Sequence, residues 1–142
     1  MTCTFFGHRD CDHTIYKTLE KTIIELIQVK GVTKFLVGNN GYFDRLVLTA
    51  LLKCSKKIPN IEYCVVLAYM PKNSVFYYPT IFPEELVNIP KRYAIPYRNK
   101  YMIENSDFVI TYVSRHFGGA YSSFKKAQKM NKTVINLYKA YE

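Results

Sequence analysis

No stretch of this chain approaches the roughly 18 apolar residues that a membrane-spanning helix needs, and the N-terminus MTCTFFGHRDC has no basic segment followed by a long apolar run. The sequence therefore predicts neither a membrane span nor a signal peptide, and it favours a cytoplasmic protein without a membrane partner. Acidic residues are scarce, with 11 Asp and Glu against 20 Lys and Arg, for a formal charge of +9. This excess favours an anionic partner, such as a nucleotide, a nucleic acid or an acidic surface, without choosing among them.

Paired cysteines are also lacking. The four cysteines show no CxxC spacing and are Cys3, Cys11, Cys54 and Cys64. In a chain without an export signal they are predicted to be reduced thiols. Cys3, His8, Cys11 and His13 lie close together in sequence, but their spacing matches no common zinc pattern and Cys3 falls in a predicted strand. We therefore expect no metal site.

Short β-prone segments alternate with segments of helical periodicity. The predicted strands are residues 2–7, 33–38, 61–70, 107–113 and 132–138. The predicted helices run from the cap Asp12 to Gly31, along an apolar stripe over 46–54, and over 97–106 and 118–130. Between them, residues 71–96 hold five prolines and many aromatics and are expected to be irregular. This order predicts a single α/β domain over 1–142: a Rossmann-like three-layer fold with a central parallel sheet of about five strands and helices on both faces.

In such sheets the ligand lies beyond the carboxyl ends of the strands, near the switch in strand order. Three polar, glycine-containing loops follow predicted strands one, two and four: GHRD at 7–10, GNNGYFD at 38–44 and RHFGGAYSS at 115–123. They should therefore line one crevice, which Arg98 could also reach. The candidate ligand-binding residues are Gly7, His8, Arg9, Gly38, Asn39, Asn40, Gly41, Asp44, Arg98, Gly118, Gly119, Ala120, Tyr121 and Ser122.

The chemistry of these loops suits a phosphate-bearing ligand. Glycines allow tight turns and let a ligand approach the backbone, and free N–H groups at the start of the helix at Gly119 favour phosphate. Arg9 offers paired donors to phosphate or carboxylate, although it can instead pair with Asp10 or Asp12. A glycine pair can also simply turn a corner.

Aromatic residues of the irregular stretch and the helix after it offer a further possibility: Tyr77, Tyr78, Phe82, Tyr93 and Tyr97. Such rings could stack on a base, or they could cover the edge of the sheet.

Four segments of the chain resemble the SLOG superfamily, in particular its YpsA-like branch of bacterial and phage proteins. These segments are TFFGHRD, VGNNGYFDRLVLTAL, YRNKYMIENSDFVITYV and GGAYSSFKKAQKMNKTVINL, in the same order over nearly the whole chain. The resemblance implies a Rossmann-like fold. It also implies a choice among LOG phosphoribohydrolases, DprA-type DNA-binding proteins and sensors of NAD-derived signals.

The LOG enzymes carry a PGGxGTxxE loop and an upstream arginine. An alignment on Gly118 and Gly119 places Lys125 at the catalytic glutamate, whereas Arg98 matches the upstream arginine. Because a lysine cannot act as a carboxylate, the resemblance predicts no catalytic residue here, unless Glu104 or Asp44 supplies the carboxylate from elsewhere.

Three hypotheses stay open. The favoured one is a sensor or sequestering protein for a nucleotide or a nucleotide-derived small molecule, including an NAD- or ADP-ribose-like ligand. The second is a hydrolase or transferase acting on an N-glycosidic bond. The third is a DNA-binding module, suggested by the charge of +9, although nucleic acid is the less favoured partner. Homo-oligomers are common on this fold, but the sequence locates no interface.

Overall fold

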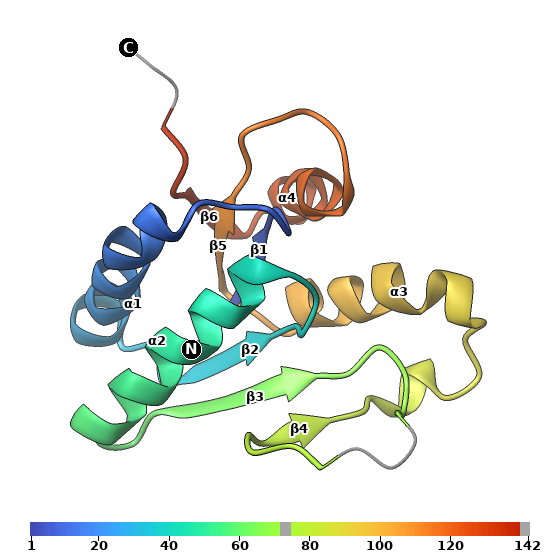
Figure 1. The fold of residues 1–142 in the computed structure, drawn as a ribbon, viewed down its shortest axis with the longest axis horizontal. Coiled ribbons are helices and arrows are strands. Elements are labelled where there is room, and N and C mark those ends of the chain that lie inside the picture. Colours follow the sequence, from blue (N-terminus) through green and yellow to red (C-terminus); the bar gives the residue numbers. More distant parts are fainter. Residues whose placement is uncertain (72–74, 140–142) are drawn as a thin grey trace.

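A computed structural model describes residues 1–71 and 75–139 of the chain. It shows one parallel sheet flanked by helices on both faces, which confirms the predicted α/β, Rossmann-like class (Figure 1). The strands are β1 (Thr2–Gly7), β2 (Lys34–Val37), β3 (Glu62–Val66), β4 (Thr80–Ile81), β5 (Phe108–Tyr112) and β6 (Thr133–Asn136). The helices are α1 (Tyr16–Lys30), α2 (Tyr42–Lys57), α3 (Lys91–Glu104) and α4 (Gly119–Lys129), with short 3-10 turns η1 (His13–Ile15) and η2 (Glu84–Leu86).

The strand order is β4-β3-β2-β1-β5-β6. The chain starts inside the sheet at β1 and builds outward to β4. It then returns to the other side of β1 as β5, where the pairing runs from Cys3 beside Phe108 to Gly7 beside Tyr112. The order therefore switches between β1 and β5, and this is the position where open α/β sheets bind their ligands.

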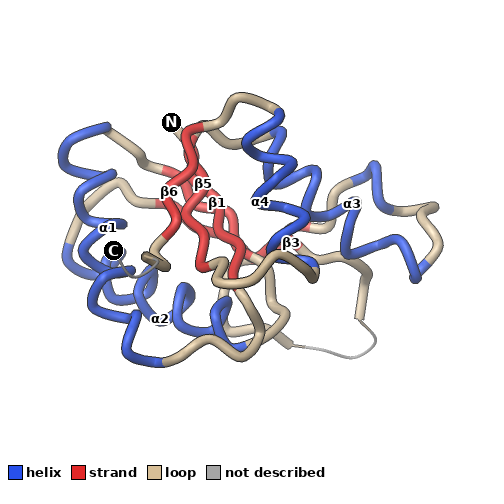
Figure 2. The backbone as a smooth tube through the Cα atoms, turned by 90° about the horizontal axis from the view of Figure 1, so that it is seen from above, coloured by secondary structure: helices blue, strands red, loops and turns tan. Residues whose placement is uncertain are grey.

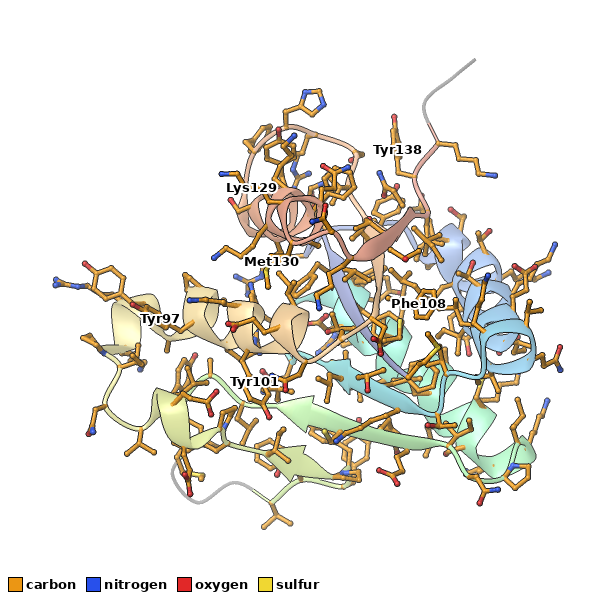
Figure 3. All side chains as sticks on the ribbon, turned by 180° about the vertical axis from the view of Figure 1, so that it is seen from behind. Tyr97, Tyr101, Phe108, Lys129, Met130 and Tyr138 are labelled. Atoms are coloured by element: carbon orange, nitrogen blue, oxygen red, sulfur yellow. The ribbon has the colours of Figure 1, made fainter. Side chains whose placement is uncertain are left out.

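Three layers are visible when the sheet is seen from above, with α1 and α2 on one side and α3 and α4 on the other (Figure 2). Alternate strand residues supply the two cores, because successive side chains point to opposite faces of a sheet. On β1, Phe5 belongs to the core beneath α1 and α2, and Phe6 to the core beneath α3 and α4. The second core is closed at its margin by Tyr101 of α3 and by Met130 just after α4 (Figure 3).

The structure corrects the prediction in the irregular stretch. A sixth strand, β4, lies there; with two residues, it is too short to show any periodicity. Helix α3 begins at Lys91 rather than at residue 97, and it contains Pro96. Pro96 has no N–H to donate to the carbonyl of Arg92, but Arg92 is exposed, so water can satisfy that carbonyl. No helix in the described ranges is long and apolar enough to cross a bilayer.

Candidate functional site

A cavity of about 410 Å³ opens at the carboxyl edge of the sheet, beside the ends of β1 and β5. Its volume lies within the roughly 300–1,000 Å³ of small-molecule sites. Ten of the residues predicted for the site line it: Gly7, His8, Arg9, Gly38, Asn40, Asp44, Arg98, Gly118, Gly119 and Ala120. Residues from four separate segments, which the sequence predicted to share one site, therefore line the same cavity.

Four predicted residues do not line this cavity. Asn39 and Gly41 line a neighbouring hollow along α2. Tyr121 lies against His116 and Phe124, with ring centroids 5.5 and 6.5 Å away. Ser122 donates its backbone N–H to the carbonyl of Gly118 and so closes the first turn of α4.

The glycines on the β1 and β2 side leave their space to the protein itself. A Cβ on Gly7 would lie 2.2 Å from the ring of Phe43, and one on Gly38 would lie 2.9 Å from the Asp44 carboxylate. A Cβ on Gly41 would lie 2.7 Å from Cγ of Arg9. The expectation that these glycines open the backbone to a ligand does not describe their surroundings, because the chain's own side chains fill the space.

The glycine pair before α4 has the opposite character. A Cβ at Gly118 or at Gly119 would meet no atom within 4 Å, and Gly118 has φ of +93°, which side chains rarely adopt. No side chain caps α4 at Gly118, and its first turn carries no acidic residue. The first N–H groups of a helix have no partner within the helix. They are therefore free to meet an anion in the cavity, where the helix dipole favours negative charge.

His8 links the segments that follow β1 and β5. Its side chain is buried, and its Nε2 accepts the backbone N–H of Ser114 at 2.9 Å. Burial, reinforced by the nearby Arg115, lowers the pKa of His8 below its usual value. The ring is thus the neutral tautomer with its proton on Nδ1, since Nε2 is an acceptor. His8 fixes the start of the β5–α4 loop through Nε2, and that nitrogen is not available to a ligand.

Asp10 and Arg115 both line the cavity and form an ion pair. The terminal nitrogens of Arg115 lie 3.0 and 3.3 Å from the two Asp10 oxygens, and the guanidinium lies 5.3 Å from the ring centroid of Phe117. Hydrogen bonding from Arg115 lowers the pKa of Asp10. The Nε of Arg115 is buried without a hydrogen-bond partner among the described residues. Arg115 therefore keeps one unmatched donor at the cavity wall.

Asp44 and Arg98 are both buried, and a Cβ on Gly38 would lie 2.9 Å from an Asp44 oxygen and 3.0 Å from an Arg98 nitrogen. Arg98 donates to the carbonyl of Val66 at 3.0 Å, and an oxygen of Asp44 accepts the backbone N–H of Asn40 at 2.9 Å. Burial raises the pKa of Asp44 to about 6, with that N–H and the charge of Arg98 acting in the opposite direction. Burial also lowers the pKa of Arg98. Each charge is thus poorly solvated and would gain from a further partner.

Arg9 is an exposed cation of the site, and none of the ion pairs formed by described residues includes it. Its backbone is fixed, because its carbonyl accepts the N–H of Tyr42 at 3.0 Å. The alternative in which Arg9 pairs with Asp10 or Asp12 is not what the structure shows. Asp10 pairs with Arg115, and Asp12 accepts the N–H of Thr14 and caps η1.

Sequence reasoning left several lining residues out of the candidate list. They are Phe5, Phe6, Asp10, Ile95, Asn99, Met102 and Arg115. Asp10 and Arg115 stand inside loops that were singled out, so the charge pattern of those loops could have found them. Ile95 and Met102 lie on α3, and no motif marks them because in the sequence they resemble ordinary core residues.

Across the described ranges, no three His, Cys, Asp or Glu side chains are placed to hold a metal ion. The fold and the cavity define a Rossmann-like α/β protein with a ligand-sized pocket at the switch in strand order. No protein-family model and no curated protein matches the chain.

Proposed function

We propose that this protein binds a nucleotide, or a nucleotide-derived small molecule, with a phosphate group of the ligand against the N-terminus of α4. The observation that carries the proposal is the open space at Gly118 and Gly119, where an uncapped helix start faces the cavity. A helix start of this kind presents backbone N–H groups and a favourable dipole to phosphate.

The charges of the cavity support an anionic ligand. Three arginines line it, Arg9, Arg98 and Arg115, against two aspartates, Asp10 and Asp44. His8 adds no charge, because burial lowers its pKa and Nε2 is an acceptor. The balance is a net positive cavity, and the arginines offer the paired N–H donors that suit phosphate oxygens.

An apolar wall supports a ligand with more than a phosphate. Ile95 of α3 lines the cavity and is 37% exposed, while Phe6 and Met102, which also line it, are buried and add little accessible surface. A free inorganic anion would leave this surface wet, whereas a sugar or another weakly polar group would cover it. The resemblance to SLOG proteins points to the same class of ligand.

The buried carboxyl group of Asp44 favours a second candidate function, hydrolysis of an N-glycosidic bond. A carboxyl group with a pKa near 6 in a pocket suits general acid or base catalysis. Lys125 is exposed and does not line the cavity. The carboxylates that line the cavity are those of Asp10 and Asp44. Asp10 is already paired with Arg115, which among the described residues leaves Asp44 as the unpaired carboxyl group of the cavity lining. We therefore favour binding over hydrolysis.

The proposal is tested by mass spectrometry of small molecules released when the freshly purified protein is heat-denatured. We expect a phosphate-bearing nucleoside derivative that is absent when the Arg9→Ala variant is purified in parallel. Release of a phosphate-free metabolite from both proteins would overturn the proposal. Free base formed from nucleoside monophosphates at above about 1 s⁻¹, the lower end of ordinary enzyme turnover, would establish the hydrolase instead.

A further inference from the structure

A second cavity, of about 540 Å³, adjoins the first and has no role in the function proposed above. The two cavities share Arg9 and Asp44 in their walls. The second one is lined by the first turns of α2 and by Tyr77 and Tyr78. A ligand that reaches from α4 into the second cavity would therefore pass Arg9 and Asp44.

The aromatic side of this second cavity is packed against the hydrophobic core. Phe76 and Tyr78 are half-buried against the core beneath α1 and α2, and their ring centroids lie 5.2 Å apart. Tyr77 between them is 87% exposed, and its ring makes an edge contact with Tyr78 at 4.9 Å. Phe76 and Tyr78 thus pack inward, whereas Tyr77 presents its ring to the solvent. A large exposed ring beside a cavity is the informative case for a binding surface.

Two arginines line the same cavity as this ring. Arg45, on α2, lines the second cavity together with Arg9. Both are exposed, and neither belongs to an ion pair formed by described residues. Guanidinium planes and tyrosine rings are the side chains on which nucleobases stack.

The first cavity offers no such stacking surface. Its aromatic lining residues, Phe5 and Phe6, are only 1% and 6% exposed, because their rings are used in the two cores. A base placed there would meet backbone, aliphatic side chains and charged groups rather than an open ring face. The two cavities therefore differ in what they can hold.

We infer that the second cavity is the base subsite: it takes a planar aromatic heterocycle, stacked on Tyr77 and held by Arg45, from a ligand whose phosphate lies at α4. The inference rests on the proposed function and adds where the base lies. Arg9, which lines both cavities, stands beside the sugar-phosphate link between them.

Calorimetric titration of the full chain with AMP, GMP, CMP and UMP, and with ribose 5-phosphate as the probe without a base, tests the inference. We expect at least one mononucleotide to bind about tenfold more tightly than ribose 5-phosphate. Tyr77→Ala should remove this difference and leave the affinity for ribose 5-phosphate unchanged. Tyr93→Ala is the matched control, since Tyr93 is an exposed tyrosine on α3 that lines neither cavity.

Each outcome separates the two claims. If Tyr77→Ala binds the preferred mononucleotide within twofold of the wild type, the base subsite is wrong while the proposed function stands. The same conclusion follows if Tyr93→Ala weakens binding as much as Tyr77→Ala. If the wild type binds none of the five probes at millimolar concentration, the proposed function fails and the base subsite fails with it. Retained binding of ribose 5-phosphate by Tyr77→Ala also shows that this variant is folded.

Discussion

The carboxyl edge of the sheet has two halves that are built in opposite ways. On the β1 and β2 side, the space beside Gly7 is occupied by the Phe43 ring and the space beside Gly38 by charged side chains. On the β5 and α4 side, the space beside Gly118 and Gly119 is empty and borders the cavity. Glycine thus serves close packing in one half and access in the other, so substitutions should affect stability in the first half and ligand binding in the second.

The largest effect is expected at Gly7. Gly7→Ala places a Cβ within 2.6 Å of three ring atoms of the fully buried Phe43. Overpacking of this kind destabilises a core by about 3 kcal/mol, at the upper end of the usual range. Urea unfolding measures the change in the free energy of unfolding. Gly119→Ala is the control, and it should change that free energy by less than about 0.5 kcal/mol but weaken nucleotide binding. Equal stability losses at both positions would remove the contrast between the halves.

Asp44 should make the stability of the closed half depend on pH. Burial raises its folded-state pKa to about 6 from an ordinary value of 3.8, so the folded chain binds this proton more tightly than the unfolded chain. The resulting stability is complete below pH 3.8 and is lost as the pH rises through about 6. The loss is on the order of 2–3 kcal/mol.

The comparison with Asp44→Asn isolates this contribution. Burial lowers the pKa of His8, which makes both proteins less stable as the pH falls in the same range. The difference in unfolding free energy between variant and wild type should therefore be measured at pH 4.5 and pH 7.5. We expect the variant to gain relative to the wild type at the higher pH. A difference that is the same at both pH values would show that Asp44 ionises as an ordinary carboxyl group.

Arg9 should matter for the ligand and not for the fold. Arg9→Ala removes an exposed cation at the junction of the two cavities. Loss of a charge-assisted hydrogen bond should weaken nucleotide binding by about 1.5–3 kcal/mol, as calorimetry would measure. Arg92→Ala, which removes an exposed arginine that packs on Tyr93 outside both cavities, is the control. Unchanged affinity in Arg9→Ala would exclude Arg9 from the site.

The smallest effect is expected for DNA. Lys125, Lys126 and Lys129 are exposed on α4 and do not line the cavity, and Lys129 lies on the outside of that helix (Figure 3). Anisotropy titrations at two salt concentrations should show only nonspecific binding, about 10⁻⁴ to 10⁻⁶ M at physiological salt. Submicromolar affinity at 150 mM salt that disappears when the three lysines are replaced would make α4 a DNA-binding face.

The sequence predicted the layers of the fold because apolar periodicity reports burial, and Gly31 ends α1 as expected. It could not reveal β4, whose two residues carry no period, or the start of α3, since Pro96 is the usual sign of a helix end. The candidate site was likewise predicted only in part. The loops were found because topology brings strand ends together. The contact of Phe43 with Gly7 was not found, because it depends on how α2 packs across β1.

A phosphate group at the N-terminus of α4 should change the environment of the backbone amides in the first turn of that helix. These amides can be followed in NMR spectra of ¹⁵N-labelled protein while the tightest-binding nucleoside monophosphate is added. We predict that the largest downfield shifts fall on Gly119 and Ala120, whose N–H groups belong to the open first turn of α4, and that Gly119→Ala reduces them. Saturable binding that leaves these two amides unmoved and shifts signals elsewhere would contradict the account.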